Sequence, residues 1–262
     1  MSHLSLLVAK DVSKRFGGVQ ALAEVSFSID RGEIYGLIGP NGAGKTSLFN
    51  VLTGIYEPDE GSFLFDGEPL DRLKPNDVAE RGVARTFQNI RLFQNLSALE
   101  NVMIGRHVRT KAGVLGAIFR DKRTRAEEAA IERRAYELLD YVGVAKRAND
   151  LAKHLAYGDQ RRLEIARALA TEPKLLALDE PAAGMNATET QGLKRLLEDI
   201  RRDGTTILLI EHDMKLVMSV CDRVLVLDYG RKIAEDSAAV VQNDPKVIAA
   251  YLGGDIALKV RH

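Results

Sequence analysis

The sequence predicts an α/β fold: a parallel sheet covered by helices, with an N-terminal antiparallel β subdomain and an inserted helical subdomain. Three runs, 34–39, 175–179 and 206–210, are continuously apolar, as expected of strands that are covered on both faces. A helical pattern follows each run, which favours repeated strand–helix units. An alternating segment before these runs and a polar, helix-rich segment between them predict the two additional subdomains.

Composition places the chain among ordinary globular proteins. Its 262 residues are 45% apolar and 28% charged, enough for one large domain with an ample core. The 37 basic and 37 acidic residues cancel, so we expect no nucleic-acid partner. No apolar run approaches the ~20 residues of a membrane-spanning helix, and no secretory signal is recognisable. The single cysteine, Cys221, excludes an internal disulfide, and we expect an intracellular chain that reaches a membrane only through a partner.

The outer elements follow from local patterns. Val25, Phe27 and Ile29 alternate with polar residues after a turn at 17–18, which predicts the antiparallel sheet. The run 224–235 reads as a terminal hairpin turning near Gly230. A short helix near the end is predicted by its cap residues, Asp244, Pro245 and Gly253.

The segment 95–165 is predicted to be the helical subdomain. It holds one apolar helical stripe that ends at a glycine: Ile131, Ala135, Leu138, Leu139, Val142 and then Gly143. We therefore expect a single domain, 1–262, in which 1–94 and 166–262 form the α/β core with its antiparallel β subdomain.

A glycine-rich loop predicts a nucleotide site. Gly39, Gly44, Lys45 and Thr46 satisfy G-x-x-x-x-G-K-[ST] between a predicted strand and a helix. Glycines let backbone N–H groups curl around phosphate oxygens, while Lys45 reaches the β- and γ-phosphates and the Thr46 hydroxyl binds Mg²⁺. The core is therefore a P-loop NTPase (RecA-like) core, whose loop contributes Gly39, Asn41, Gly42, Ala43, Gly44, Lys45, Thr46 and Ser47. Kinases, GTPases and motors share this motif; the alternative is a chance glycine-rich loop.

Two carboxylates follow the second apolar run. Asp179 ends that strand, where it can hold the Mg²⁺ shell. Glu180 comes next and is placed to orient or deprotonate an attacking water. Two acidic residues that cap the following element are the alternative.

Three further residues are candidates for the same site. The chain has no N-K-x-D guanine-reading motif, and Phe16 could stack on adenine, unless it is an ordinary core residue. His212, just past the third apolar run, could touch the γ-phosphate, although a lone histidine there is more often structural. Gln88 could complete the Mg²⁺ shell and sense the γ-phosphate, or be an unremarkable polar residue. Lys45, Gln88, Glu180 and His212 form the expected catalytic set.

A second helix start also suits an anion. The segment LAYGDQRRLEIARAL, 155–169, predicts a tight glycine turn and then a helix over 158–170. A helix terminus contributes about 0.3–1 kcal/mol to anion binding, and up to ~2 kcal/mol when partly buried. Even millimolar affinity requires ~4.1 kcal/mol. This helix could therefore only complete a site that another chain has mostly built; a core helix that begins with a glycine is the alternative.

Taken in order, these motifs resemble the ATP-binding subunit of ABC transporters, from Phe16 to Gly254. The resemblance implies ATP and Mg²⁺ as cofactors and a head-to-tail dimer with a second ATPase subunit. In that dimer the signature segment binds the ATP of the other subunit through Leu155, Ala156, Tyr157, Gly158, Asp159 and Asn186. Two features depart from the family pattern. Ala156, Tyr157 and Asp159 replace the Ser, Gly and Gln of the usual LSGGQ, and Asn186 stands where an Asp is usual.

The segments that contain these departures resemble those of the ATPase subunit of bacterial branched-chain amino-acid uptake systems. The similar segments are RTFQNIRLF, LAYGDQRRLEIAR, DEPAAGMN, LLIEHDMKLVM and YLGG. The resemblance implies a cytoplasmic ATPase, peripheral on the inner face of the cell membrane, with separate permease subunits and, indirectly, a solute-binding protein. Urea or amide uptake, lipopolysaccharide export and soluble iron–sulfur assembly remain alternatives. A nucleic-acid ABC protein is disfavoured by the neutral charge and the lack of zinc cysteines.

Two surfaces are candidates for contact with the membrane assembly. The resemblance places permease helices behind Gln88, at Arg91, Leu92 and Phe93. The segment 106–125 carries seven Lys/Arg residues and one Asp, so it suits lipid headgroups or the permease; a solvated loop is the alternative.

Overall fold

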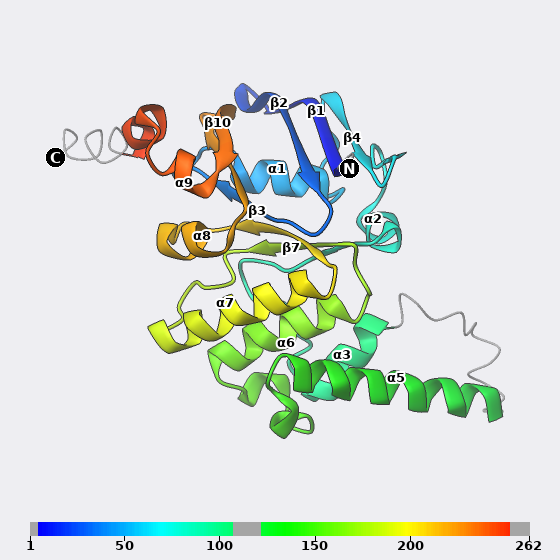
Figure 1. The fold of residues 1–262 in the computed structure, drawn as a ribbon. Helices are drawn as coiled ribbons and strands as arrows, with labels where there is room; N and C mark the ends of the chain where they lie inside the picture. The colour runs from blue at the N-terminus through cyan, green and yellow to red at the C-terminus, as the bar shows by residue number, and fades with distance from the viewer. Residues whose placement is uncertain (1–4, 107–121, 252–262) are drawn as a thin grey trace.

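The computed structural model describes residues 5–106 and 122–251 (Figure 1). Within these ranges the strands form two sheets, of order β2-β1-β4-β5 and β10-β9-β3-β8-β7-β6. The α/β prediction is therefore confirmed, with an antiparallel sheet beside a mainly parallel one. The first sheet contains β1 (Ser5–Phe16), β2 (Val19–Asp30), β4 (Glu60–Phe65) and β5 (Glu68–Pro69). The second contains β3 (Ile34–Ile38), β6 (Val83–Arg85), β7 (Leu175–Asp179), β8 (Thr206–Ile210), β9 (Arg223–Asp228) and β10 (Arg231–Ser237).

The antiparallel sheet begins with the predicted hairpin. Phe16 pairs with Val19 across the turn, and Gly17 there has φ +57°, a left-handed conformation that glycine adopts readily. The alternating apolar residues of β2 point into the core, where Val25 and Ile29 are fully buried.

The parallel strands are apolar throughout because both faces of the sheet are covered. Along β7, Leu176 and Leu178 pack into the cluster that contains the larger helices. Their neighbours Leu175 and Ala177 pack into the cluster shared with the antiparallel sheet. Successive side chains point to opposite faces of a strand, so a continuous apolar run serves two cores. The terminal hairpin also forms as predicted, with β9 and β10 antiparallel and Gly230 in the turn.

The helices divide between the two faces of the parallel sheet. The cluster shared with the antiparallel sheet contains buried side chains of α1 and α2, whereas the opposite cluster contains those of α3 and α5 to α9. Figure 1 shows α3, α5, α6 and α7 together below the sheet. The α-helices are α1 (Lys45–Leu52), α2 (Pro75–Arg81), α3 (Ala98–Arg106), α5 (Lys122–Tyr141), α6 (Tyr157–Leu169), α7 (Ala187–Arg202), α8 (Met214–Val220) and α9 (Ala238–Val241). Two short 3-10 turns, η2 (Ala145–Arg147) and η3 (Ala152–His154), precede α6.

The helical segment lies where the sequence predicts it. The predicted stripe of α5 is buried, with Ala135 1% and Leu139 0% exposed. These residues share one hydrophobic cluster with the parallel sheet, and α6 runs across residue 165. The predicted boundary of the helical subdomain at residue 165 falls inside α6, and the hydrophobic core continues across it. The subdomain bounds 95–165 therefore stay a prediction.

The C-terminal helix is present over residues 245–251. The Asp244 carboxylate accepts from the Lys246 N–H at 2.7 Å, so Asp244 caps the helix as predicted. The predicted cap at Gly253 lies outside the described residues, as does most of the basic segment 106–125. None of the helices in the described ranges has the length and apolar character needed to cross a bilayer.

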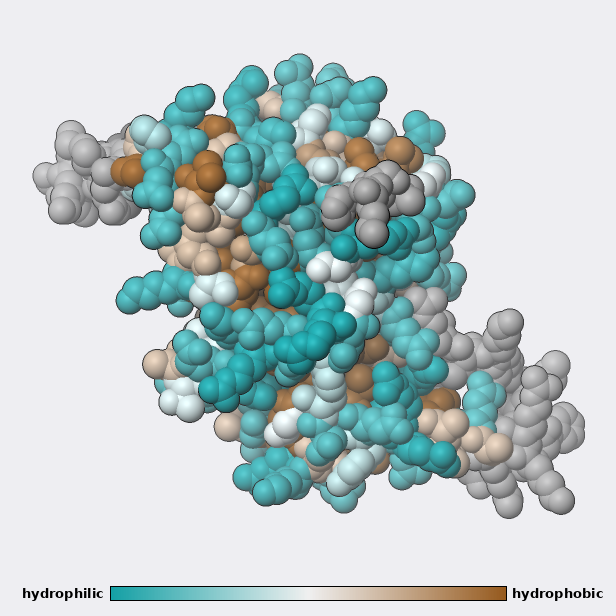
Figure 2. All heavy atoms as spheres, viewed as in Figure 1, coloured by the Kyte–Doolittle hydropathy of each residue, from teal (hydrophilic) through white to brown (hydrophobic). Residues whose placement is uncertain are grey.

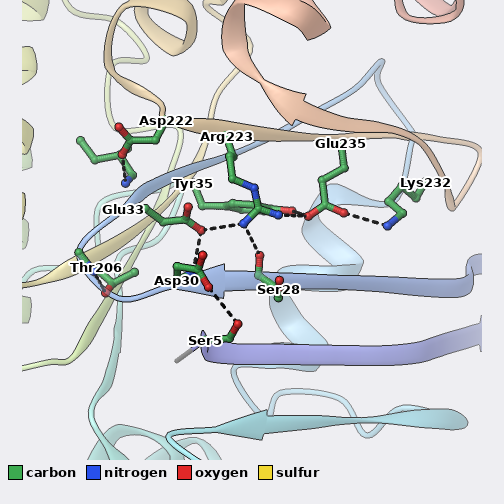
Figure 3. Close-up of polar contacts among 12 residues, drawn as sticks. Ser5, Ser28, Asp30, Glu33, Tyr35, Thr206, Asp222, Arg223, Lys232 and Glu235 are labelled. Atoms are coloured by element: carbon green, nitrogen blue, oxygen red, sulfur yellow. Dashed lines mark hydrogen bonds and ion pairs between the residues drawn. The ribbon is translucent and has the colours of Figure 1, made fainter. Parts of the chain in front are cut away.

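A partly buried polar network joins β3, β9 and β10 of the second sheet to one another and to β2 of the first (Figure 3). The Arg223 guanidinium donates to the Ser28 carbonyl of β2 at 3.2 Å and to the Glu235 carboxylate at 2.7 Å. The fully buried Tyr35 donates its hydroxyl hydrogen to the same carboxylate at 2.7 Å. The network thus holds the β9–β10 hairpin against the edge of the antiparallel sheet.

Candidate nucleotide-binding and catalytic site

The glycine-rich loop joins β3 to α1, and its glycines are required by close packing. Gly39 has φ +150°, and a Cβ there would collide with the Leu227 carbonyl. Gly44 has φ +103°, and a Cβ there would lie 2.6 Å from the Ala21 carbonyl. An L side chain at either position would displace neighbouring backbone. The loop shape is therefore fixed by the elements around it.

The loop is tied to the hairpin behind it. The Gly230 N–H donates to the Ala43 carbonyl at 2.9 Å, and the Ala23 N–H donates to the Gly230 carbonyl at 2.8 Å. Ala43 is buried, whereas Asn41 and Gly42 form the exposed tip. The cradle is thus held from behind, and its tip faces solvent.

Lys45 lies folded over the loop. Its ammonium donates to the Gly39 carbonyl at 2.6 Å and to the Pro40 carbonyl at 3.0 Å. Burial lowers the pKa of Lys45, and the nearby carboxylates of Glu180 and Asp179 oppose that shift. The ammonium therefore lies among the loop carbonyls, where an anion bound by the loop would meet it.

The carboxyl ends of β7 and β8 carry the acidic residues. Asp179 is 4% exposed; burial raises the pKa of its carboxyl, and Arg85, 3.8 Å away, opposes the shift. Glu180 has φ +48°, rare for a non-glycine residue, and its N–H donates to the Ile210 carbonyl at 2.9 Å. This hydrogen bond holds the backbone turn that projects Glu180 from the end of β7.

Gln88 and His212 both approach Glu180. The Gln88 amide donates through Nε2 to Glu180 Oε2 at 2.9 Å. His212 Nδ1 lies 3.6 Å from the same oxygen, and the imidazole is 63% exposed. The structure therefore brings three of the four candidate catalytic side chains together, and Lys45 interacts electrostatically with Glu180.

The candidate Mg²⁺ ligands suit a hard cation. Thr46 offers a hydroxyl from the first turn of α1, Asp179 a buried carboxylate and Gln88 an amide oxygen. Mg²⁺ prefers such oxygen donors and usually shares them with substrate phosphates and waters. No group of three or more His, Cys, Asp or Glu residues in the described ranges is arranged to hold a metal alone.

Phe16 is a surface residue. It is 40% exposed and makes an edge contact with Tyr56, their ring centroids 5.1 Å apart. The alternative of an ordinary core phenylalanine is therefore wrong, because most core rings here are under 6% exposed. The Lys14 ammonium lies over the ring, 5.7 Å from its centroid, and stacking on adenine stays a prediction.

The signature helix α6 begins one residue earlier than predicted. Ala156 is its N-cap and provides no side-chain hydrogen bond, Leu155 is buried, and Tyr157 is 46% exposed. Gly158 lies in the first helical turn, so the predicted tight glycine turn before the helix is wrong. A Cβ at Gly158 would lie 2.8 Å from a carboxylate oxygen of Glu189, the movable end of a side chain of α7.

Asn186 caps α7. Its side-chain oxygen accepts from the N–H groups of Thr188 and Glu189, both at 3.0 Å. The Glu189 carboxylate accepts from the Asn186 N–H at 2.9 Å in return, which completes a capping box. An aspartate could accept the same bonds, so the departure at this position leaves the helix start intact.

The motifs did not identify a buried ion pair on α6. Arg161 and Glu164 are 2% and 1% exposed and lie 3.3 Å apart. Arg161 donates to the main-chain carbonyls of Phe87 and Gln88, while Glu164 accepts from the Phe87 and Arg91 N–H groups. The i,i+3 charge pair is the signal in the sequence, but exposed pairs such as Arg134–Glu137 share that spacing.

The C-terminal helix also reaches the phosphate loop. The Tyr251 hydroxyl is buried and makes no hydrogen bond of regular geometry within the described ranges. Burial raises the pKa of Tyr251, and the nearby Gly39 N–H opposes the shift. No motif in the sequence indicated this approach.

The phosphate loop and the signature helix lie on opposite faces of the parallel sheet. Leu48 and Phe49 of α1 belong to the cluster on one face, and Leu163 and Ile165 of α6 to the cluster on the other. Among the described residues, no hydrogen bond joins 155–160 to 39–47. Within one chain, the two anion-facing helix starts do not meet.

Comparison with known proteins agrees with this geometry. Residues 22–183 match the family described as "ABC transporter", and residues 231–257 match "Branched-chain amino acid ATP-binding cassette transporter". The chain is 44% identical to the high-affinity branched-chain amino acid transport ATP-binding protein LivG of Escherichia coli (strain K12), covering 95% of this chain and 98% of that protein. It is 43% identical to BraF of Pseudomonas aeruginosa, a protein of the same description, with the same coverage.

Solved structures share the fold. An ATP-binding cassette of an ABC transporter in its ADP conformation superposes with a TM-score of 0.83 at 31% identity, covering 95% of this chain and 99% of that chain. A dimeric cassette in a post-hydrolysis state, bound to ADP and Pi, superposes with a TM-score of 0.76 at 25% identity, covering 88% and 98%. The predictions of family, fold class and enzymatic activity are confirmed: the chain belongs to the ABC transporter family and is one of its ATP-hydrolysing cassettes.

Proposed function

We propose that the chain is the ATP-binding subunit of an importer for branched-chain or other hydrophobic amino acids. The 44% and 43% identities to LivG and BraF over nearly the whole chain support this cargo. A lipopolysaccharide-export ATP-binding protein, LptB of Haemophilus influenzae, is 31% identical over 97% of the chain. The higher identity and the match over 231–257 favour the amino-acid importer.

Two chains share each nucleotide in this proposal. The observation that carries it is the position of α1 and α6 on opposite faces of the sheet, with the α6 N-terminus exposed. A head-to-tail dimer places the phosphate loop of one chain against residues 155–160 of the other and forms two such sites. The Tyr157 hydroxyl accepts from Arg161 at 3.1 Å, so the exposed signature segment is connected to the Gln88 loop of its own chain.

Each candidate residue has its own role in ATP hydrolysis. The loop N–H groups and Lys45 bind the phosphates, while Phe16 stacks on the adenine. Glu180 accepts a proton from the attacking water, and Gln88 and His212 hold its carboxylate in position. Thr46, Asp179 and Gln88 would hold Mg²⁺, which supplies neutralisation of the phosphate charge.

A groove beside the Gln88 loop suits a permease helix. It has a volume of about 380 Å³, and its apolar lining includes Ile55, Val78, Ala79, Phe87, Phe93 and Ile104. Phe93 is 49% and Ile55 41% exposed, an unusual position for such side chains unless a partner covers them. We name this surface the docking groove and propose that it receives a cytoplasmic helix of the permease.

We also propose a location at the membrane for the chain. A permease bound at the docking groove places the chain on the inner face of the cell membrane, and a solute-binding protein would deliver amino acids on the other side. The face in Figure 2 is mostly hydrophilic, with hydrophobic residues near the C-terminal elements. There Val240 and Ile248 are 54% and 45% exposed.

Transport assays test the cargo. The chain is co-expressed with candidate permease subunits, and the complex is reconstituted in vesicles that contain ATP. We expect uptake of radiolabelled leucine, isoleucine or valine in the presence of the solute-binding protein, and none with Glu180→Gln. ATP-dependent uptake of urea, or lipopolysaccharide extraction without amino-acid uptake, would contradict the proposed cargo.

Mixing two defective variants tests the shared site. Lys45→Ala removes the phosphate-binding ammonium, and Tyr157→Glu places a negative charge on the exposed signature segment. Each variant alone should be inactive. An equal mixture should recover roughly a quarter of the wild-type rate, since half the dimers are mixed and each contains one intact site. An inactive mixture that still forms dimers in sedimentation analysis would contradict sharing between chains.

A further inference from the structure

Arg85 lies between the docking groove and the acidic end of β7. It is the last residue of the edge strand β6, pairs in register with Ala177 of β7 and lines the docking groove. Its side chain is 11% exposed. A cation so well buried needs partners that compensate for its lost hydration.

Aromatic rings supply part of that compensation. The Arg85 guanidinium carbon lies 4.4 Å from the centroid of Phe49 in α1 and 4.7 Å from the centroid of Phe87. Arginine stacks favourably on such rings at these distances. Phe87 also lines the docking groove, so one partner of Arg85 is a side chain that a helix bound in the groove would touch.

The polar contacts of Arg85 connect Thr53, another residue of the groove lining, with the acidic end of β7. Nη1 donates to the Thr53 hydroxyl at 2.8 Å, and Nη2 lies 3.8 Å from Asp179 Oδ2. Nε is buried without a hydrogen-bond partner among the described residues. The pair with Asp179 is thus an ion pair at longer than hydrogen-bond distance, and a small movement of the guanidinium would strengthen or weaken it.

We propose that Arg85 is a positioning residue that transmits occupancy of the docking groove to Asp179. A permease helix that presses on Phe87 moves the stacked guanidinium and so changes how the Asp179 carboxylate is held for Mg²⁺. The inference rests on the proposed function for the identity of the groove's occupant. The contacts between Arg85 and Asp179 do not depend on that identity.

Arg91 provides a matched control. Its guanidinium also lies over the Phe87 ring, at 4.2 Å, but no ion pair connects it with Asp179 in the described ranges. The test variants are Arg85→Met and Thr53→Val; the second removes the hydroxyl that holds the guanidinium and leaves Arg85 in place. Phe87→Leu removes the ring on the groove side.

The measurement is the Mg²⁺ dependence of ATP binding to the purified chain, followed with a fluorescent ATP analogue. We expect Arg85→Met to raise the Mg²⁺ concentration for half-saturation about tenfold, the equivalent of ~1.4 kcal/mol. Thr53→Val and Phe87→Leu should raise it less, and Arg91→Met should leave it unchanged. Binding in EDTA should be equal in all variants, and thermal unfolding identifies any variant that is not folded.

The outcomes separate the two proposals. If wild-type chain binds Mg²⁺ and ATP but Arg85→Met and Thr53→Val match it, the inference is overturned and the proposed function stands. If wild-type chain binds no ATP, the proposed function itself fails. In the assembled transporter, Phe87→Leu should reduce the stimulation of ATP hydrolysis by the permease relative to the wild-type chain. Stimulation equal to that of the wild type would overturn the link to the groove.

Discussion

The Arg161 guanidinium donates to the main-chain carbonyl of Phe87 at 2.7 Å. This hydrogen bond joins the signature helix to the loop that carries Gln88, two segments separated by over seventy residues. Glu164, 3.3 Å from Arg161, accepts from the N–H groups at both ends of the same loop segment, 87–91. The loop and the helix are therefore expected to move as one unit.

Removal of Arg161 should strongly destabilise the chain. Arg161→Met removes the cation nearest to the buried Glu164 carboxylate and leaves only the interaction with Arg167; breaking a buried pair typically costs about 3–5 kcal/mol. Adding Glu164→Gln removes the stranded charge and should restore part of that loss in urea unfolding. Arg134→Met, in an exposed pair of the same spacing, should change stability by less than ~1 kcal/mol. Equal losses for the two arginine variants would contradict the importance of burial.

Glu180→Gln should abolish turnover and spare ATP binding. A general base typically contributes ~10²–10⁴ in rate, and the amide keeps the size of the side chain that Gln88 contacts. Glu24→Gln is the control, because Glu24 is exposed on β2 and shares the positive φ, +53° against +48°. Steady-state hydrolysis and nucleotide affinity are measured for both. Unchanged hydrolysis in Glu180→Gln would remove Glu180 from the catalytic role.

Ala156→Ser should stabilise both the isolated chain and the ATP-bound dimer. Ala156 is the N-cap of α6 and gives no side-chain hydrogen bond, while a serine there typically adds ~1 kcal/mol. Its hydroxyl also faces the opposing nucleotide in the proposed dimer. Thermal unfolding and sedimentation with ATP report the two effects. Ala129→Ser, in the exposed middle of α5, should improve neither; weaker dimerisation of Ala156→Ser would count against the shared site.

Tyr35→Phe should weaken the contact between β3 and β10, two strands of the second sheet. The change removes a hydrogen bond from a fully buried hydroxyl to the Glu235 carboxylate, and bonds to charged groups contribute about 1.5–3 kcal/mol. We expect that loss in urea unfolding, with ATP affinity retained. Tyr229→Phe is the matched control, because Tyr229 is 86% exposed. A stable Tyr35→Phe chain would mean that the network contributes little.

The Cys221 thiol should resist labelling in the folded chain. Cys221 is 8% exposed, and burial raises the pKa of its thiol, so the reactive thiolate is scarce at pH 8. Ellman's reagent should react with less than one thiol per chain in buffer and with one after guanidinium unfolding. Because the folded pKa is raised, increasing the pH to 9 should speed labelling of the unfolded chain far more than that of the folded chain. Rapid native labelling would contradict the burial.

The sequence was sufficient to predict the fold class and the family. Continuous apolar runs identified β3, β7 and β8 because burial on both faces removes alternation, and the helical stripe identified α5. The phosphate loop was recognisable because its glycines serve backbone geometry that no other residue adopts. The prediction at Gly158 was wrong because this glycine lies inside the first turn of α6, and the sequence does not distinguish a helical glycine from one in a turn.

The buried charges could not be predicted. Arg85, Arg161 and Glu164 look like ordinary polar residues in the sequence, since their roles depend on partners far along the chain. The approach of Tyr251 to Gly39 likewise depends on how the C-terminal helix folds back over the sheet. Such contacts are set by tertiary packing, on which local patterns give no information.

Strand pairing sets a further limit on how the site can change. Asp179 and Ile210 are register partners at the ends of β7 and β8, so Glu180 and Glu211 leave the sheet side by side. Loss of one residue within β8 would pull His212 back by about 3.3 Å and rotate it to the other face. A change of one residue in the spacing between β8 and His212 would thus misplace the imidazole. Insertions and deletions in related chains should therefore fall in surface loops.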